Sequence, residues 1–304
     1  MDIIDKFLLI ALDANCRASY EALSRQLSVS ANAVRKRIVN LIDSNVITDF
    51  VVLLSPAMTG AEMVFLLIQT DGCEDPEAIT DTIGNHPLVL QVTRIASACR
   101  GTYMALAEYI ESPQLLELSS FVRSVECVES VEIHPLLIDK GGRIDFAKAH
   151  LKILRALKDD PRMQISEIAR KTKLSARSAR RILQQLIDSR ALIFGTRWDL
   201  AAGGGMRFFA HIRYDEQKIN YSELDDRLRE QYSLEYWYSY VSATEPVVFA
   251  NFVVEHLRDA NRISSELVRM PFIRSAIPLI QYPTKKYPRI GMTMLDDILK
   301  ETEL

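Results

Sequence analysis

The sequence predicts an α+β fold in which two winged helix-turn-helix domains and two ferredoxin-like βαββαβ domains alternate in tandem. Three observations lead to this fold class: a long internal repeat, a helical pattern at the start of each repeat, and a recurring order of strands and helices behind it. The chain of 304 residues exceeds the usual size of one domain, and its 48% apolar content suffices to fill several cores.

The internal repeat is found by shifting the sequence against itself so that residues 2–50 align with residues 147–195 without a gap. The run LIDS at 41–44 then falls on the same four letters at 186–189. Chance is a poor explanation for such a run. Other matched pairs are Leu9 with Leu154, Leu12 with Leu157, Arg17 with Arg162, Arg25 with Arg170 and Arg35 with Arg180.

Each copy begins with a pattern typical of three helices, the third starting after Ser30 or Ser175. Serine is a good N-cap because its hydroxyl oxygen accepts a hydrogen bond from a backbone N–H of the first turn. In the third helix of the first copy an apolar stripe faces inward, and the basic side chains lie on the other face. Apolar, β-prone segments follow at 47–54 and 192–198, and each predicts a wing hairpin.

Behind each headpiece the pattern predicts strand, helix, two strands, helix and strand, which is the ferredoxin-like order. A last helix is expected near 292–303 without a counterpart in the first half. The expected elements lie near 63–70, 76–84, 88–97, 102–110, 113–124 and 128–135 in the first half, and near 206–214, 221–230, 233–243, 247–254, 257–269 and 273–281 in the second.

These patterns divide the chain into six segments. The segment 138–145 contains Gly141 and Gly142 and is expected to be a hinge-like linker between the halves. The expected domains are winged helix-turn-helix 1 at 1–54, ferredoxin-like domain 1 at 55–137, the linker at 138–145, winged helix-turn-helix 2 at 146–200, ferredoxin-like domain 2 at 201–290 and a C-terminal helix at 291–304.

Composition narrows the class of protein. No stretch reaches the roughly 20 apolar residues of a membrane helix, and the first residues carry acids where a signal peptide carries cations. We therefore expect a cytoplasmic protein without a membrane partner. Cys16, Cys73, Cys99 and Cys127 lack the CxxC spacing and are expected to be reduced thiols.

The histidines show no metal-ligand spacing along the chain. His86, His134, His150, His211 and His256 form no HxxxH or His–Cys cluster, so no metal site, catalytic residue or cofactor is expected. The glycine run at 203–205 lacks the GxxxxGK pattern of a phosphate-binding loop. Tyr236, Tyr238 and Tyr240 alternate along an expected strand and are assigned to one face, where they favour packing between sheets.

The run LSVSANAVRKRIVNLIDSNVITDFVVLLSPAMTG at 27–60, followed by a βαββαβ unit, resembles the Lrp/AsnC family of bacterial and archaeal regulators. The second half resembles the family more loosely. Members of the family typically carry one headpiece and one sensor domain per chain and pair through their sensor sheets. The resemblance therefore implies two such units fused in tandem, with double-stranded DNA as partner and a homo-oligomer formed through the sensor-type domains.

In a helix-turn-helix, the N-terminal part of the second helix meets base edges, and flanking cations meet phosphates. Asparagine pairs with adenine and arginine with guanine in bidentate fashion. The candidates for reading bases are Asn32, Arg35, Arg177, Ser178 and Arg180, and those for phosphate contacts are Lys36, Arg37, Arg181, Lys171 and Lys173.

Positive charge is concentrated on the headpieces although the chain as a whole carries a net charge of -3. Between Ser19 and Ile42 four cations face one acid, and between Gln164 and Ile187 six cations face one acid. A basic helix face is often only a solvated face, but here its capped trihelical context occurs twice. The two headpieces differ in sequence, so target sites with unlike halves are expected, and the second headpiece is the better candidate if only one binds DNA.

The family's sensor domain often binds an amino acid near the turn between its second and third strands, at a Gly-Asp-containing segment. The matching segments here are 99–102 and 243–246, and neither keeps that pattern. Arg100 and Thr102 are the residues that could hold an anionic effector, through a guanidinium fork and a hydroxyl. A solvated turn arginine is the simpler interpretation.

Two other functions stay open at this point. The same architecture resembles that of decarboxylases acting on a siroheme-type tetrapyrrole, since fold does not settle function. Such an enzyme needs a large pocket lined by histidine or arginine, and it does not need cationic recognition helices. The other alternative is a non-specific architectural DNA-binding protein. The cations on both headpieces favour the sequence-specific regulator.

Overall fold

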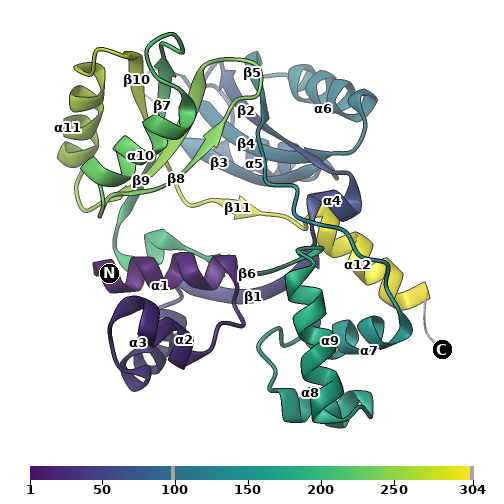
Figure 1. The fold of residues 1–304 in the computed structure, drawn as a ribbon. Coiled ribbons are helices and arrows are strands. Elements are labelled where there is room, and N and C mark those ends of the chain that lie inside the picture. Colours follow the sequence, from purple (N-terminus) through teal and green to yellow (C-terminus); the bar gives the residue numbers. More distant parts are fainter. Residues whose placement is uncertain (97–99, 302–304) are drawn as a thin grey trace. The chain divides into compact units, whose positions relative to one another are not determined.

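The structure of the chain, a computed structural model, describes residues 1–96 and 100–301 and divides into two compact units. Unit 1 contains Met1–Gly60, Asp139–Gly203 and the C-terminal segment from Ile290. Unit 2 contains Ala61–Ile138 and Gly204–Arg289. Each unit therefore takes one domain from each half of the repeat (Figure 1).

Unit 1 contains the two headpieces. Its first headpiece consists of α1 (Ile3–Ala14), α2 (Tyr20–Leu27), α3 (Ala31–Asp43) and β1 (Ile47–Leu54), followed by α4 (Pro56–Thr59). The second consists of α7 (Lys148–Leu157), α8 (Ile165–Thr172), α9 (Ala176–Asp188) and β6 (Leu192–Trp198), followed by a 3-10 turn (Leu200–Gly203). The helices α2 and α3 correspond residue for residue to α8 and α9, as the repeat predicts.

The two headpieces also share their caps and turns. Ser30 accepts a hydrogen bond from the backbone N–H of Ala33, and Ser175 accepts one from that of Ser178. The turn before each recognition helix contains a residue in the left-handed region, Ser28 with φ 55° and Lys173 with φ 56°. Since non-glycine residues rarely adopt this conformation, its recurrence at matched positions shows that the same turn is built twice.

The prediction of a wing hairpin in each headpiece is wrong. Each headpiece supplies a single strand, and β1 pairs with β6 in an antiparallel two-stranded sheet that joins the two headpieces. Leu54 pairs with Leu192, and Val51 pairs with Gly195. Both segments are strands, as predicted, but each pairs with the strand of the other copy and not within its own headpiece. We call this sheet the β1–β6 ribbon.

A matched pair of arginines also links the headpieces. Arg17 donates to the backbone carbonyls of Pro161 and, at 2.7 Å, Met163 in the second copy. Its counterpart Arg162 lies over the rings of Tyr20 and Phe50 in the first copy. Both arginines therefore hold unit 1 together, which explains why the repeat keeps them.

The segment 139–144 packs within unit 1 instead of forming a free linker. The Ala57 N–H donates to Lys140 O at 2.7 Å, and the Gly142 N–H donates to Arg190 O at 2.7 Å. Gly141 has φ 70°, and a Cβ on Gly142 would lie 2.0 Å from Ser189 O. The glycines therefore allow a close approach of two backbones. Helix α12 (Ile290–Glu301) packs beside this segment and closes the core of the second headpiece.

Unit 2 contains two ferredoxin-like domains with the predicted βαββαβ order. The first consists of β2 (Glu62–Thr70), α5 (Pro76–Gly84), β3 (Val89–Ile95), β4 (Thr102–Tyr109), α6 (Ser112–Ser124) and β5 (Val128–Leu136). The second consists of β7 (Met206–Tyr214), α10 (Tyr221–Gln231), β8 (Tyr236–Val241), β9 (Val247–Val254), α11 (Leu257–Val268) and β10 (Ile273–Ile280). The strand orders are β5-β2-β4-β3 and β10-β7-β9-β8, and a short strand β11 (Lys285–Lys286) adds to β3.

The two sheets of unit 2 pack against each other through a shared apolar core. Phe65 on β2 stacks on Phe249 of β9 with ring centroids 3.8 Å apart, and meets Phe209 of β7 edge-on at 6.0 Å. The helices cover the outer faces, as in the core formed by β7–β10 with α10 and α11. The two sheet faces, one from each copy of the repeat, are thus joined within one chain.

The expected alternation of tyrosines on β8 is only partly correct. Tyr238 and Tyr240 pack between the sheets, but Tyr236 lies in the core on the helix side. A register shift between Tyr236 and Tyr238 separates them, because a β-bulge adds a residue and reverses the side-chain direction.

No helix within residues 1–96 and 100–301 is long and apolar enough to span a membrane.

Candidate nucleic-acid interface

Helix α3 presents the first candidate reading surface. Val34, Ile38 and Leu41 are buried against α1 and α2, so the opposite face of the helix points to solvent. Asn32 and Arg35 are exposed on that face in the first two turns. These are positions from which side chains reach base edges when such a helix enters a major groove.

Helix α9 presents the second surface, which is more basic. Ala179, Leu183 and Leu186 face the core, while Arg177, Arg180 and Arg181 are exposed. Ser178 is half-buried, and its hydroxyl accepts a hydrogen bond from Ser175 Oγ at 2.9 Å. Ser178 therefore takes part in the cap, which leaves its hydroxyl less available to a base than the arginines are.

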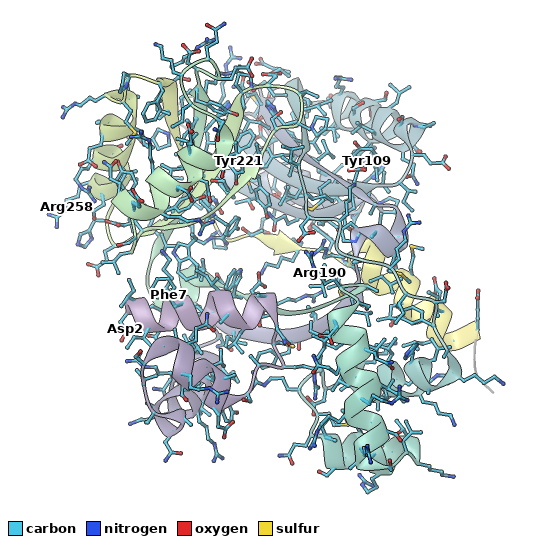
Figure 2. All side chains as sticks on the ribbon, viewed as in Figure 1. Asp2, Phe7, Tyr109, Arg190, Tyr221 and Arg258 are labelled. Atoms are coloured by element: carbon cyan, nitrogen blue, oxygen red, sulfur yellow. The ribbon has the colours of Figure 1, made fainter. Side chains whose placement is uncertain are left out.

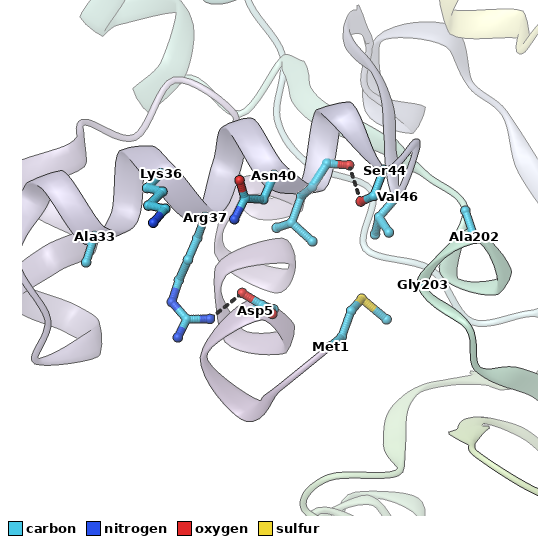
Figure 3. Close-up of a pocket in the computed structure, with 11 residues that line it drawn as sticks. Met1, Asp5, Ala33, Lys36, Arg37, Asn40, Ser44, Val46, Ala202 and Gly203 are labelled. Atoms are coloured by element: carbon cyan, nitrogen blue, oxygen red, sulfur yellow. Dashed lines mark hydrogen bonds and ion pairs between the residues drawn. The ribbon is translucent and has the colours of Figure 1, made fainter.

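The basic side chains around each recognition helix differ in how free they are to contact phosphates. Lys36, Lys171 and Lys173 are exposed, and Lys171 lies 3.7 Å from Glu167 on its own helix. Arg37 instead points toward the start of α1, where its guanidinium lies 2.6 Å from Asp5 (Figure 3). The same guanidinium nitrogen lies 2.8 Å from Asp2. This double ion pair ties α3 to α1, so we leave Arg37 out of the proposed phosphate contacts.

A groove of about 660 Å³ lies beside this ion pair on the first headpiece. Lys36, Asn40 and Met1 line it, together with Gly203 from the turn after β6 (Figure 3). Both charges and apolar atoms face the groove, and it opens widely to solvent. It is therefore a feature of the headpiece surface and not an enclosed ligand cavity.

The β1–β6 ribbon brings the two headpieces into one unit. In Figure 1, α2 and α3 of one headpiece and α8 and α9 of the other extend below this ribbon. Arg190, at the base of α9 (Figure 2), is ion-paired with Asp139 from the segment 139–144 and also carries a positive φ of 52°. The position of α9 is thus fixed by the same segment that was expected to be a hinge.

The candidate effector residues lie in unit 2 at the start of β4. Arg100 is exposed and forms an ion pair with Glu129, and Thr102 pairs with Gln69 and Ile95 of the neighbouring strands. Cys99, the residue before Arg100 in the sequence, lies outside the described residues. An anionic ligand at Arg100 would have to replace Glu129.

The structure brings together two histidines that the sequence analysis treated as scattered. His134 on β5 and His211 on β7 have ring centroids 6.2 Å apart, and Glu132 lies beside them. Burial lowers the pKa of His211 to about 4, so its imidazole is neutral at neutral pH. The two histidines are far apart in the sequence but close in the structure, because strands β5 and β7 come together only when the two sheets pack.

The comparisons with known proteins agree with this geometry. The AsnC-type helix-turn-helix domain matches residues 1–42, and a winged helix-turn-helix DNA-binding domain matches residues 147–190. These are the two headpieces. The fold and these matches thus define a protein with two helix-turn-helix domains in tandem. Each headpiece is therefore similar to a helix-turn-helix domain of this kind, and the chain carries such a domain twice.

Two relatives and one solved structure illustrate the likeness. An uncharacterised helix-turn-helix-type transcriptional regulator of Pyrococcus abyssi is 29% identical over 106 residues, covering 31% of this chain and 67% of the relative. The transcriptional regulator Ptr1 of Methanocaldococcus jannaschii is 24% identical, covering 54% of this chain and 99% of the relative. The siroheme decarboxylase NirDL matches over 100% of both chains with a TM-score of 0.59 and 12% identity, which is a likeness of fold.

Proposed function

We propose that this protein is a sequence-specific DNA-binding transcriptional regulator. The observation that carries the proposal is the pair of capped recognition helices in one compact unit, with exposed Arg35 on α3 and three exposed arginines on α9. The relatives named as transcriptional regulators support the same conclusion.

In this proposal α3 and α9 each enter a major groove. Arg35 on α3 and Arg180 on α9 occupy matched positions and read bases, with Asn32 and Arg177 beside them. The exposed lysines Lys36, Lys171 and Lys173 and the exposed Arg181 contact phosphates, which positions the helices without reading sequence. The β1–β6 ribbon holds the two helices at one separation, and this separation sets the spacing of the half-sites.

The proposal is tested by Arg35→Ala and Arg180→Ala in the full chain, with Arg258→Ala as the matched control. Arg258 is an exposed arginine on α11 in unit 2 (Figure 2). Each headpiece variant should lose about 1–3 kcal/mol of specific binding free energy, because an arginine that reads guanine contributes about that much. Unchanged affinity and salt dependence in both headpiece variants would contradict the proposal.

Competition with random DNA separates the regulator from an architectural protein. A regulator retains its preferred fragment when random fragments are in excess, since specific sites are bound at least about a thousandfold more tightly. An architectural protein releases the preferred fragment in proportion to the amount of random DNA added. We expect the first outcome.

An enzymatic function is the second candidate because the full-length fold likeness is to a siroheme decarboxylase. The two functions make different demands on the headpieces: a regulator needs exposed arginines on α3 and α9, and a decarboxylase does not. Incubation of the protein with an iron-containing tetrapyrrole distinguishes them. We expect no Soret shift and no decarboxylated product, and a shift with product formation would establish the enzyme.

Two further partners belong to the proposal. A small anionic effector would contact Arg100 and Thr102. Isothermal titration of candidate ligands into the wild-type chain and into Arg100→Ala tests this contact.

A homo-oligomer through the sensor-type domains would need a surface other than the packed sheet faces, since these are already occupied within the chain. Sedimentation velocity measures that state directly.

A further inference from the structure

Three potential metal ligands meet inside unit 2. Glu132 and His134 lie on β5 in the first copy, and His211 lies on β7 in the second. One ligand atom from each of the three side chains lies within 4.8 Å of the other two. From these side chains, we propose a binding site for one divalent transition-metal ion, Zn²⁺ in the first place, that joins the two copies.

The two imidazoles are buried, and three of their four ring nitrogens form no hydrogen bond with the described residues. His134 is 1% exposed and neither of its ring nitrogens has a hydrogen-bond partner among the described residues, and His211 Nε2 is likewise unpartnered at 5% exposure. Leaving such groups unsatisfied in a protein interior is unfavourable. An ion coordinated by one nitrogen of each ring would satisfy two of these three nitrogens.

The surrounding residues already orient the two rings. His211 stacks on Phe249 with centroids 4.8 Å apart, and His134 meets the same ring edge-on at 5.1 Å. Glu132 Oε2 lies 3.5 Å from His134 Nε2, and its side chain is 45% exposed. Two ligand atoms of a tetrahedral Zn²⁺ ion are roughly 3.3 Å apart, so a modest closure completes the site, and an ion enters on the Glu132 side.

Arg213 lies next to the Glu132 carboxylate, so its positive charge must stay paired when Glu132 binds an ion. A guanidinium nitrogen of Arg213 is 3.8 Å from Glu132, but another is 3.2 Å from Glu245. Glu245 therefore keeps Arg213 paired when Glu132 turns to an ion. Two nitrogens and one carboxylate with an open fourth position form a donor set that suits Zn²⁺ and neighbouring first-row metals.

The internal repeat provides a comparison within the molecule. The strands align so that His134 matches Leu279, Glu132 matches Ile277 and His211 matches Leu67. All three ligand positions are thus apolar on the other side of the sheet pair. One side of a duplicated structure has acquired ligands at all three positions together, which packing alone does not require.

The test uses the full chain after treatment with a chelator and desalting. Zinc content is measured by mass spectrometry after equilibration with Zn²⁺, and Co²⁺ is added separately to record its ligand-field absorption. We expect about one ion per chain and a Co²⁺ spectrum typical of four-coordination that added Zn²⁺ abolishes. A wild-type chain that binds no stoichiometric ion overturns the proposal.

The variants separate ligation from folding. The double variant His134→Leu with His211→Leu takes the residues that the other copy uses at these positions, so it should fold and bind no ion. Glu132→Gln changes an exposed side chain and should weaken binding by at least about tenfold. His256→Gln alters an exposed histidine elsewhere and should bind as the wild type does. Binding retained in a folded double variant, or unchanged in Glu132→Gln, contradicts the three-ligand site.

Discussion

At the scale of single residues, Lys173 combines a structural cost with a proposed role in binding. It has φ 56° at the end of α8, where Ser28 in the other copy has φ 55°. A side chain in this conformation costs roughly 1 kcal/mol, which glycine avoids. A lysine kept in such a position is consistent with a phosphate contact that offsets the strain.

We expect Lys173→Gly to raise the free energy of unfolding by up to about 1 kcal/mol and to weaken DNA binding. The salt dependence of binding should fall by about one counterion, because one phosphate contact is lost. Ser28→Gly is the matched control, and it should stabilise the protein without changing the salt dependence. Equal effects of both variants on DNA binding would remove Lys173 from the interface.

The thiols should also differ in reactivity. Burial raises the pKa of Cys16 to about 11, whereas Cys73 is exposed. Since the thiolate is the reactive form, alkylation at pH 8 should modify Cys73 rapidly and leave Cys16 unmodified until the protein unfolds. The thiolate of Cys16 becomes abundant only as the pH approaches 11. Peptide mass spectrometry after timed labelling measures this, and rapid labelling of native Cys16 would show that its site is open.

At the scale of elements, local patterns predicted most helices and strands, and pairings between distant segments were not predicted. Caps, apolar periods and turns are properties of neighbouring residues, so α2, α3 and their repeats could be located from the sequence. The partner of β1 could not be located in this way, because β6 lies in the other copy and shares no turn with it. The bulge after Tyr236 also lacks a sequence signal.

The packed segment 139–144 provides an element-scale prediction. Gly142→Ala should destabilise unit 1 by about 2 kcal/mol or more, because its Cβ would lie 2.0 Å from the backbone oxygen of Ser189. Gly204→Ala is the control, since Gly204 has φ 82° with no atom within 4 Å of the added Cβ and should lose only about 1 kcal/mol. Urea unfolding of both variants measures the difference. Equal losses would show that the segment can move away.

The ion pair between α1 and α3 should contribute little to the free energy of unfolding. Arg37→Ala removes contacts to Asp2 and Asp5, but Arg37 and Asp2 are 29% and 52% exposed. Because solvent screens such pairs, we expect a loss below about 1 kcal/mol, smaller still at high salt. Specific DNA affinity should stay within about twofold of the wild type if Arg37 contacts no phosphate. Thermal denaturation and a binding titration measure the two effects separately.

At the scale of the whole molecule, the two copies are alike in backbone and unlike in the residues that carry function. The headpieces differ at matched positions, with Arg37 where the other copy has Ile182 and Asn32 where it has Arg177. The sheet pair differs in the same way around His134 and His211. Such differences could be read from the repeat, whereas the proximity of the two histidines could not.

Selection of bound DNA from a random pool should therefore give sites whose halves differ. An arginine-rich α9 favours guanine contacts, and Asn32 on α3 favours adenine. Exchange of Asn32 and Arg177 between the headpieces should exchange the preferred half-sites. Recovery of perfect palindromes alone would mean that only one headpiece reads sequence or that two chains share a site.

The β1–β6 ribbon has a consequence for how the protein responds to its own concentration. When two separate chains form such a ribbon, assembly is second order and dilution separates the reading heads. Here the strands belong to one polypeptide, so closure of the ribbon is unimolecular and independent of protein concentration. If one chain occupies one site, occupancy should follow a simple hyperbola in protein concentration, with a Hill coefficient near one.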